Sequence, residues 1–156
     1  MGFFPKRMRL YAPMAGTAVP LTQVPDPAFS GEMLGKGLAI LPQEGKIYAP
    51  CDGAIDTIFP TGHGLTLVAP WGGEILIHVG LETVTLESGV FTPHVAAGQQ
   101  VKRGQLLLKA DLEAIRVAGR NPITPVVLCN WRNFSDFHIL SPGEVTAETA
   151  VMELRV

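Results

Sequence analysis

Residues 10–16 read Leu-Tyr-Ala-Pro-Met-Ala-Gly and residues 47–53 read Ile-Tyr-Ala-Pro-Cys-Asp-Gly, so one pattern recurs after 37 residues. In both copies an apolar stretch leads into a Pro-x-x-Gly turn, which is typical of a strand that ends in a tight turn. A second pair of similar segments lies at residues 98–107 and 143–151, and its second copy lacks the inner glycine. The repetition predicts two related strand-turn-strand units.

Short apolar runs bounded by glycine or proline occupy much of the remaining chain. They lie at residues 37–41, 54–59, 65–69, 75–79, 105–110 and 125–129. Such regular punctuation is typical of an all-β sandwich or barrel. Asp26 and Asp111 can cap brief helices at residues 27–34 and 112–118, each followed by a glycine. The expected fold is an all-β antiparallel sandwich, a barrel-sandwich hybrid with short helical turns and an internal strand-turn repeat.

The composition of the 156 residues excludes several classes of protein. With 17 glycines, 13 prolines and only 17% charged residues, the chain is a poor candidate for long helices, coiled coils or disorder. A formal charge of −2 without a basic stripe argues against nucleic-acid binding. The longest uncharged stretch, residues 57–73, contains two prolines and four glycines, so no stable membrane insertion is expected. We expect a cytoplasmic monomer with an N-terminal tail at residues 1–8 and one domain at residues 9–156.

A hairpin can bring two of the four histidines together. His63 precedes one apolar run and His78 ends the next. If these runs pair around a four-residue turn at residues 70–73, Leu65 lies opposite His78. His63 is then the diagonal neighbour of His78, about 7–8 Å away between Cα atoms, and the two imidazoles can converge on one atom. The other two histidines have no visible partner and are interpreted as ordinary surface or half-buried residues: His94 and His138.

The residues next to His63 fit a site that another molecule can approach. Gly62 and Gly64 flank it and remove side-chain bulk. Period-two alternation predicts that three further side chains share the face of the histidine pair. These are Thr61, Leu65 and Leu76.

Two converging imidazoles, without a nearby cysteine nucleophile or paired acids, are compatible with three roles. They can be structural, they can bind a metal, or they can handle a phosphoryl group. Neutral imidazole is nucleophilic and accepts a phosphoryl group on nitrogen, while a second imidazole can donate to the phosphoryl oxygens. A catalytic zinc site needs at least three protein ligands, and the hairpin supplies two. Geometry alone leaves the three roles open.

Several segments, taken in chain order, carry a family resemblance. They are residues 10–16, 24–27, 34–40, 48–53, 61–63, 75–84 and 124–130. Together they resemble the glucose-type enzyme IIA domain of the bacterial sugar phosphotransferase system, from about residue 9 to the end. The resemblance implies a β-sandwich phosphocarrier that needs no cofactor. It would receive a phosphoryl group from the phosphocarrier protein HPr and pass it to a cysteine on the IIB domain of a glucose-family permease.

The resemblance also implies roles for individual residues. By position, His78 matches the phosphorylated histidine, His63 the second histidine, which stabilises the phosphoryl group, and Thr61 the threonine that orients the second ring. Asp26 and Glu82 match acids at the rim that face the basic surface of HPr, although many members have aspartate in place of Glu82. The family surrounds its histidines with an apolar docking face, and the matching positions are Phe29, Met33, Leu34, Phe59, Leu65 and Leu76.

Two other functions stay as alternatives. A zinc-dependent LytM-like hydrolase would use His63 and His78 as metal ligands, but the chain has neither the HxxxD nor the HxH motif of that class. A biotinyl or lipoyl carrier is suggested by the paired glycines around Val101, but no lysine occupies the expected turn. No metal is expected in the isolated chain, although His63 and His78 can share one if a partner supplies further ligands.

Overall fold

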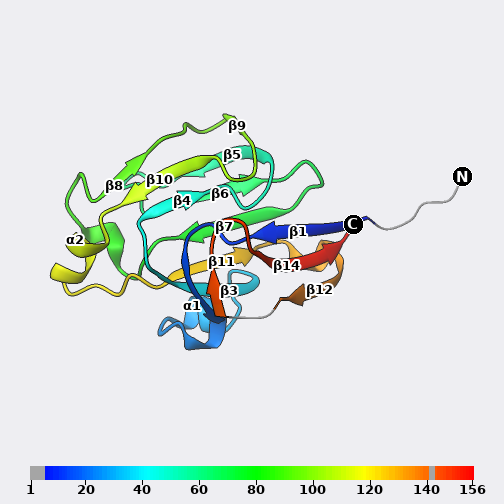
Figure 1. Ribbon diagram of the computed structural model, residues 1–156, viewed down its shortest axis with the longest axis horizontal. Coiled ribbons are helices and arrows are strands. Elements are labelled where there is room, and N and C mark those ends of the chain that lie inside the picture. The colour runs from blue at the N-terminus through cyan, green and yellow to red at the C-terminus, as the bar shows by residue number, and fades with distance from the viewer. Residues whose placement is uncertain (1–5, 141–142) are drawn as a thin grey trace, which may run out of the picture.

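The computed structural model describes residues 6–140 and 143–156, whose regular structure is mainly β-strand with little helix (Figure 1). The strands are β1 (Arg7–Tyr11), β2 (Gly16–Pro20), β3 (Lys36–Pro42), β4 (Lys46–Tyr48), β5 (Gly53–Ile58), β6 (Gly64–Val68), β7 (Glu74–His78), β8 (Phe91–Pro93), β9 (Gln100–Val101), β10 (Leu106–Ala110), β11 (Thr124–Leu128), β12 (Ser135–Ile139), β13 (Gly143–Val145) and β14 (Ala150–Arg155). The helices are α1 (Pro27–Ser30) and α2 (Leu112–Val117), with 3-10 turns η1 (Leu21–Gln23), η2 (Thr83–Thr85) and η3 (Trp131–Asn133). Most of the tail expected at residues 1–8 lies outside the described residues, and Arg7 and Met8 already belong to β1.

In the described ranges the strands pair antiparallel and form three sheets. The largest has the order β13-β2-β3-β11-β7-β6-β5-β9, and the smaller ones have the orders β1-β14-β12 and β4-β10-β8. In Figure 1, β1 and β14 run side by side near one end, while α1 lies beside β3. Residues from the large sheet and both small sheets share one apolar core. The predicted all-β, sandwich-like fold is confirmed, with sheets that do not close into a barrel.

The central strands of the large sheet are buried on both faces. In β11, Val126 and Leu128 belong to the larger core between the sheets, whereas Val127 belongs to a smaller core on the other face. In β7, Ile77 faces the larger core and Leu76 the smaller one. Burial on both faces explains why these strands are continuous apolar runs rather than alternating ones. The smaller core, which is covered by η1 and α1, lies under the candidate site.

The two Pro-x-x-Gly turns of the repeat contact each other. The backbone N–H of Tyr11 donates to the carbonyl oxygen of Pro50 at 2.9 Å. The N–H of Tyr48 donates in return to the carbonyl oxygen of Pro13 at 2.6 Å. Equivalent residues of the two copies therefore exchange equivalent hydrogen bonds.

The second pair of similar segments completes the repeat. The N–H of Lys102 donates to Gln105 Oε1, and the N–H of Thr146 donates to Thr149 Oγ1, each at 3.1 Å. The strand before each of these turns pairs with the strand that follows one Pro-x-x-Gly turn, so β9 pairs with β5 and β13 pairs with β2. The predicted internal repeat is thus confirmed at the level of individual bonds.

Both predicted helix caps are present. Asp26 accepts a hydrogen bond from the N–H of Ala28, and Asp111 accepts one from the N–H of Ala114, each at 3.0 Å. α2 has nearly the expected length, but α1 ends at Ser30 rather than at residue 34. Glu32, two residues later, has a φ of 58°, which no right-handed helix accommodates.

The hairpin that carries the histidines differs by one residue from the prediction. Gly64 lies opposite His78, and Leu65 pairs with Ile77. The turn has three residues, 70–72, and ends on a glycine with a φ of 93°, whereas the prediction assumed four residues. A shift of one residue moves a side chain to the opposite face of the sheet. The prediction that Leu65 shares the face of His78 is therefore wrong, because Leu65 is fully buried in the larger core.

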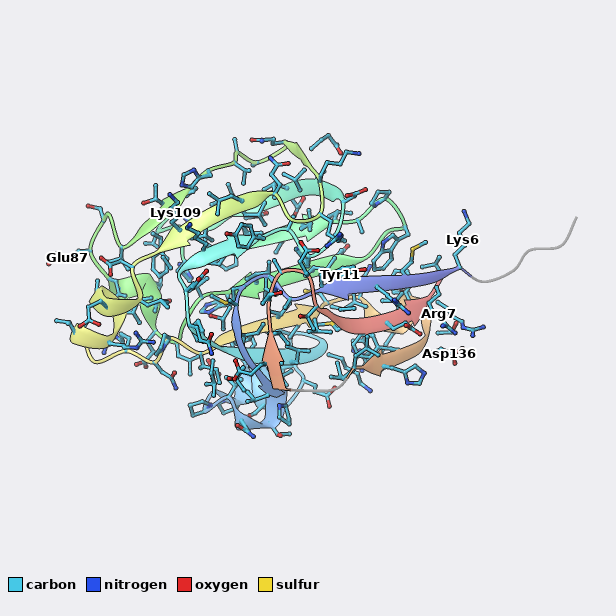
Figure 2. All side chains as sticks on the ribbon, viewed as in Figure 1. Lys6, Arg7, Tyr11, Glu87, Lys109 and Asp136 are labelled. Carbon is cyan, nitrogen blue, oxygen red and sulfur yellow. The ribbon has the colours of Figure 1, made fainter. Side chains whose placement is uncertain are left out.

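The sheet β1-β14-β12 lies at one end of the molecule. Figure 2 shows Arg7 and Asp136 at this end and Glu87, which follows η2, at the opposite end. The carboxylate of Glu153 in β14 forms ion pairs with two arginines of β1. Its oxygens lie 3.0 Å from Arg7 Nε and 3.1 Å from Arg9 Nε. Within residues 6–140 and 143–156, no helix is long and apolar enough to cross a membrane.

Candidate active site

His63 and His78 lie together at one end of the β6–β7 hairpin. Their ring centroids are 4.9 Å apart and the rings meet nearly edge to face, at 78°. His78 ends β7, while His63 immediately precedes β6, and its carbonyl oxygen accepts the N–H of Val79 at 2.7 Å. Because β6 begins only at Gly64, the side chain of His63 is free from strand alternation and lies beside His78. The pairing of the two histidines is as predicted, although the register that produces it is not.

The ring of His78 is held by a backbone carbonyl two residues further along the chain. Its Nδ1 lies 2.7 Å from the carbonyl oxygen of Gly80. A carbonyl oxygen can only accept, so Nδ1 carries the proton and the lone pair of the neutral ring is on Nε2. Gly80 has a φ of 78°, and a Cβ there would lie 2.6 Å from Thr83 Cγ2. Only glycine fits this turn, which aims its carbonyl back at the ring.

The ring of His63 is held by a side chain instead. Thr61 Oγ1 and His63 Nδ1 form a short hydrogen bond. Gly62 between them has a φ of 77°, which lets the chain fold back so that the exposed Thr61 reaches the buried ring. The hydrogen bonds of the described residues thus engage Nδ1 of both rings and neither Nε2.

Burial keeps both rings uncharged at neutral pH. Desolvation by burial, and then the neighbouring His78, lower the pKa of His63 to about 4. Burial also lowers the pKa of His78, although the Gly80 carbonyl and the charge of Asp26 act in the opposite direction. The site therefore presents two neutral imidazoles, and the hydrogen bond to Gly80 places the free lone pair of His78 on Nε2.

Three phenylalanines surround the pair. Phe59 contacts both rings, with centroid distances of 5.1 Å to His63 and 6.3 Å to His78. Phe29 lies 5.3 Å from His78, and Phe91 lies 6.3 Å from His63. These apolar contacts account for the desolvation of the two rings.

Gly64 makes room for one of these phenylalanines. A Cβ at this position would lie 2.9 Å from the ring of Phe59 and 2.9 Å from the carbonyl oxygen of Ile77. The spacing of glycine, histidine and glycine at residues 62–64 is therefore required by packing within the site as well as by access to it.

The positions of the predicted docking residues divide into three groups. Met33 and Leu34 are exposed, at 76% and 42%, and Phe59 is half-buried. Phe29 and Leu76 are buried in the smaller core, beneath the surface. The remaining position, Leu65, lies in the larger core on the other face of the sheet and has no surface to offer.

The two predicted rim acids lie on one recess. Asp26 is half-buried, with its carboxylate capping α1, and Glu82 is exposed in a left-handed conformation. Both line a surface recess of about 480 Å³ together with Arg120. A cationic side chain of a partner would find two carboxylates there.

Other chemically reactive residues lie apart from this arrangement. His94 and His138 are exposed. Burial raises the pKa of Cys51 to about 12 and also raises that of the half-buried Cys129, so neither thiol ionises at neutral pH. In the part of the chain that the structure describes, no group of three or more His, Cys, Asp or Glu residues is placed to hold a metal ion.

The sequence did not reveal every group of the site. The Gly80 carbonyl, which fixes His78, and the ring of Phe91, which contacts His63, were both missed. A glycine two residues after a histidine that ends a strand was the available signal for the first. Phe91 belongs to β8, which is separated from His63 in the sequence by β6, β7 and η2, so no local pattern connects the two residues.

Comparisons with known proteins agree on one family. The family described as the phosphoenolpyruvate-dependent sugar phosphotransferase system, EIIA 1, matches residues 8–134. The glucose-specific EIIA component of Halalkalibacterium halodurans is 39% identical over 153 residues, which cover 97% of this chain and 88% of that protein. In structure, the glucose permease IIA of Mycoplasma capricolum superposes with a TM-score of 0.90 at 34% identity, covering 98% of this chain and 99% of that one.

Longer proteins contain a similar segment. The β-glucoside-specific EIIBCA component of Dickeya chrysanthemi is 41% identical over 145 residues, 93% of this chain but 23% of that protein. The glucose-specific EIICBA component of Streptococcus pneumoniae is 43% identical over 147 residues, 94% of this chain and 20% of that protein. The chain thus spans between a fifth and a quarter of the length of these two relatives.

Proposed function

Because this chain belongs to the EIIA 1 family of the phosphoenolpyruvate-dependent sugar phosphotransferase system, we propose that it accepts a phosphoryl group on Nε2 of His78 and passes it on. The observation that carries the proposal is the hydrogen bond from His78 Nδ1 to the Gly80 carbonyl. It leaves the nucleophilic nitrogen of a neutral ring beside a second imidazole. The zinc-hydrolase and biotinyl or lipoyl alternatives find no support in the family match.

The lowered pKa of His78 favours the attack. A neutral imidazole has a free lone pair at cellular pH, whereas an imidazolium has none. When Nε2 attacks phosphorus, the ring gains positive charge while Nδ1 keeps its proton. The Gly80 carbonyl and the nearby carboxylate of Asp26 stabilise that charge. The same groups that oppose the lowering of the pKa therefore stabilise the phosphorylated ring.

His63 serves the phosphoryl oxygens. If the hydroxyl of Thr61 donates to His63 Nδ1, the proton of the neutral ring is on Nε2, beside His78. From there it donates to an oxygen of the phosphoryl group on His78. Thr61 is accordingly a positioning residue, which selects the useful tautomer of the second ring.

The transfer balances without a further reactant. In the first step, the bond between phosphorus and the histidine nitrogen of phospho-HPr breaks, that nitrogen leaves with the electron pair, and the bond to His78 Nε2 forms. In the second step a cysteine thiolate of a IIB domain attacks phosphorus, and His78 regains its lone pair. Phosphoryl transfer depends on in-line positioning and on stabilised oxygen charge, which two imidazoles supply. We therefore propose that the chain needs no metal or other cofactor.

The surroundings of the histidines suit protein partners. Met33 and Leu34, which follow α1, are exposed apolar side chains, and Asp26 and Glu82 provide negative charge on one recess. A basic partner surface such as that of HPr would complement these acids. The names of the Dickeya and Streptococcus relatives join EIIA with EIIB and EIIC in one protein, which supports a IIB domain as the next acceptor. We place the chain in the cytoplasm as a monomer, where such carriers would meet.

Reconstitution tests the proposal. Phosphoenolpyruvate, enzyme I and HPr are expected to add one phosphoryl group, stable to base and labile to acid, to the wild-type chain and none to His78→Ala. His63→Gln is expected to accept the group and to fail in passing it to a IIB domain. Intact-protein mass spectrometry measures both. Labelling that persists in His78→Ala would overturn the assignment of His78, and normal onward transfer by His63→Gln would remove the role of His63.

A further inference from the structure

A buried threonine is hydrogen-bonded to the residue that follows His78. Thr83, in η2, is fully buried, and its hydroxyl donates to the carbonyl oxygen of Val79 at 2.7 Å. The N–H of Val79 donates in turn to the carbonyl oxygen of His63. The backbone of Val79 therefore links the segment of His63 to a side chain that neither the catalytic pair nor the docking face includes.

The two peptide groups on either side of Gly80 are hydrogen-bonded at both ends. In the first, Thr83 binds the carbonyl of Val79, and the N–H of Gly80 donates to the carbonyl of Ile123 at 3.1 Å. In the second, the N–H of Leu81 donates to the carbonyl oxygen of Asn121, which precedes β11, at 2.9 Å. The carbonyl oxygen of Gly80 accepts the hydrogen bond from His78 Nδ1. Apart from the ring of His78 itself, Thr83 is the side chain in this set of bonds, and the other partners are backbone groups.

The turn held by these bonds is not one that the chain adopts readily. Gly80 adopts its φ of 78° without strain, but Glu82 has a φ of 56° although it is not glycine. Residues in this region persist where the surrounding structure holds them. Without the bond from Thr83, the peptide group between Val79 and Gly80 is held only at its N–H, by Ile123. It can then tilt and turn the neighbouring Gly80 carbonyl away from His78. The ring would then be free to carry its proton on either nitrogen.

We propose that Thr83 is a positioning residue for phosphoryl transfer, because its hydroxyl holds the turn that aims the Gly80 carbonyl at His78 Nδ1 and so keeps Nε2 unprotonated. The expected effect on the rate of phosphoryl transfer rests on the proposed function. The effect on the ring is independent of that function, since it concerns the unphosphorylated protein. A residue that served packing alone would change stability and leave the tautomer of His78 as it is.

Substitution of Thr83 separates these roles. Thr83→Val keeps the shape and removes the hydroxyl, whereas Thr83→Ser keeps the hydroxyl. Thr85→Val is the matched control, because Thr85 also donates its hydroxyl to a backbone carbonyl, that of Glu82 at 3.0 Å, but is exposed in the same turn. Nitrogen-15 NMR of the histidine rings reports the tautomer in each variant, and phosphorylation by phospho-HPr reports the rate.

We expect Thr83→Val to lose the pure Nδ1–H signature of His78 and to accept the phosphoryl group about tenfold more slowly, the effect of one buried hydrogen bond. Thr83→Ser and Thr85→Val are expected to match the wild type in both readouts. An unchanged tautomer and rate in Thr83→Val would overturn the proposal. If that variant does not fold, Thr83→Ala replaces it, and equal behaviour of Thr83→Ala and Thr83→Ser would overturn it as well. If no phosphoryl group enters the wild type, the proposed function fails while the tautomer comparison still decides the role of Thr83.

Discussion

The repeat junction, where the two Pro-x-x-Gly turns meet, and the histidine pair are both held by backbone hydrogen bonds between separate segments, but they serve different purposes. In both places backbone hydrogen bonds join two turns, from Tyr11 and Tyr48 at the junction and from Val79 at the histidines. At the junction the side chains in the turns are mostly apolar and buried. At the histidines, by contrast, two polar rings are buried, and the hydrogen bonds of the described residues leave both Nε2 atoms available to a ligand. The comparison indicates that one region is built for stability and the other accepts a cost in stability for chemistry.

Gly16, the last residue of the first repeat turn, offers the largest test of this contrast. A Cβ there would collide with the carbonyl oxygen of Leu41 in the neighbouring strand. Gly16→Ala is expected to lower the free energy of unfolding by about 3 kcal/mol, since backbone must move to relieve the clash. Urea denaturation measures the loss. The pKa of His63 in the folded variant should stay near 4, and a change in that pKa would show that the two regions are coupled.

Acid should destabilise the protein through the histidines. The pKa of His63 is lowered from 6.5 to about 4 in the folded state, so between these values the unfolded chain binds more protons. Stability is thus unaffected by this group above about pH 7 and falls as the pH drops from 6.5 toward 4. The full shift would correspond to about 3 kcal/mol, and we expect roughly 2 kcal/mol because solvent screens the charge of the protonated ring. Unfolding measured across this range should be less steep in His63→Gln. Equal slopes in the two proteins would contradict the shifted pKa.

Phe59 tests whether apolar contact causes that shift. Phe59→Leu removes part of the ring that packs on both histidines and admits water. We expect a loss of about 1 kcal/mol in stability and a rise in the pKa of His63 toward its ordinary value. A histidine titration by NMR gives the pKa directly. If it stays near 4, the desolvation arises elsewhere.

The smallest effect is expected at the end of the molecule where Figure 2 shows Arg7. There, Arg7 and Arg9 of β1 form ion pairs with Glu153 of β14. Both arginines are about half exposed. Arg9→Ala is expected to cost about 0.5 kcal/mol, less at high salt, because exposed ion pairs contribute little and are screened. Urea denaturation at two salt concentrations provides the measurement, and phosphoryl transfer should not change. A slower transfer would mean that this end also belongs to the functional surface.

The sequence predicted the architecture better than the register. The repeated Pro-x-x-Gly turns, the apolar runs and the caps at Asp26 and Asp111 are local signals, and each appears in the structure. The predicted length of the turn at residues 70–72 was wrong by one residue, because a three-residue and a four-residue turn both fit the same glycines. That single residue placed Leu65 on the wrong face.

The site was predicted in part for the same reason. Spacing and family resemblance point to side chains, and they predicted His63, His78 and Thr61, which the structure places together. The Gly80 carbonyl and Thr83 were not, since a backbone oxygen has no signature in sequence and the hydroxyl acts through tertiary contacts. Groups that orient a reactive ring are therefore harder to predict than the ring itself.

The most direct test of the central claim is the position of the phosphoryl group on His78. Nitrogen-15 and phosphorus NMR of the phosphorylated protein distinguish attachment at Nε2 from attachment at Nδ1. The hydrogen bond from Nδ1 to the Gly80 carbonyl predicts coupling of phosphorus to Nε2, with the proton retained on Nδ1. Coupling to Nδ1 of His78, or to a nitrogen of His63, would contradict the account.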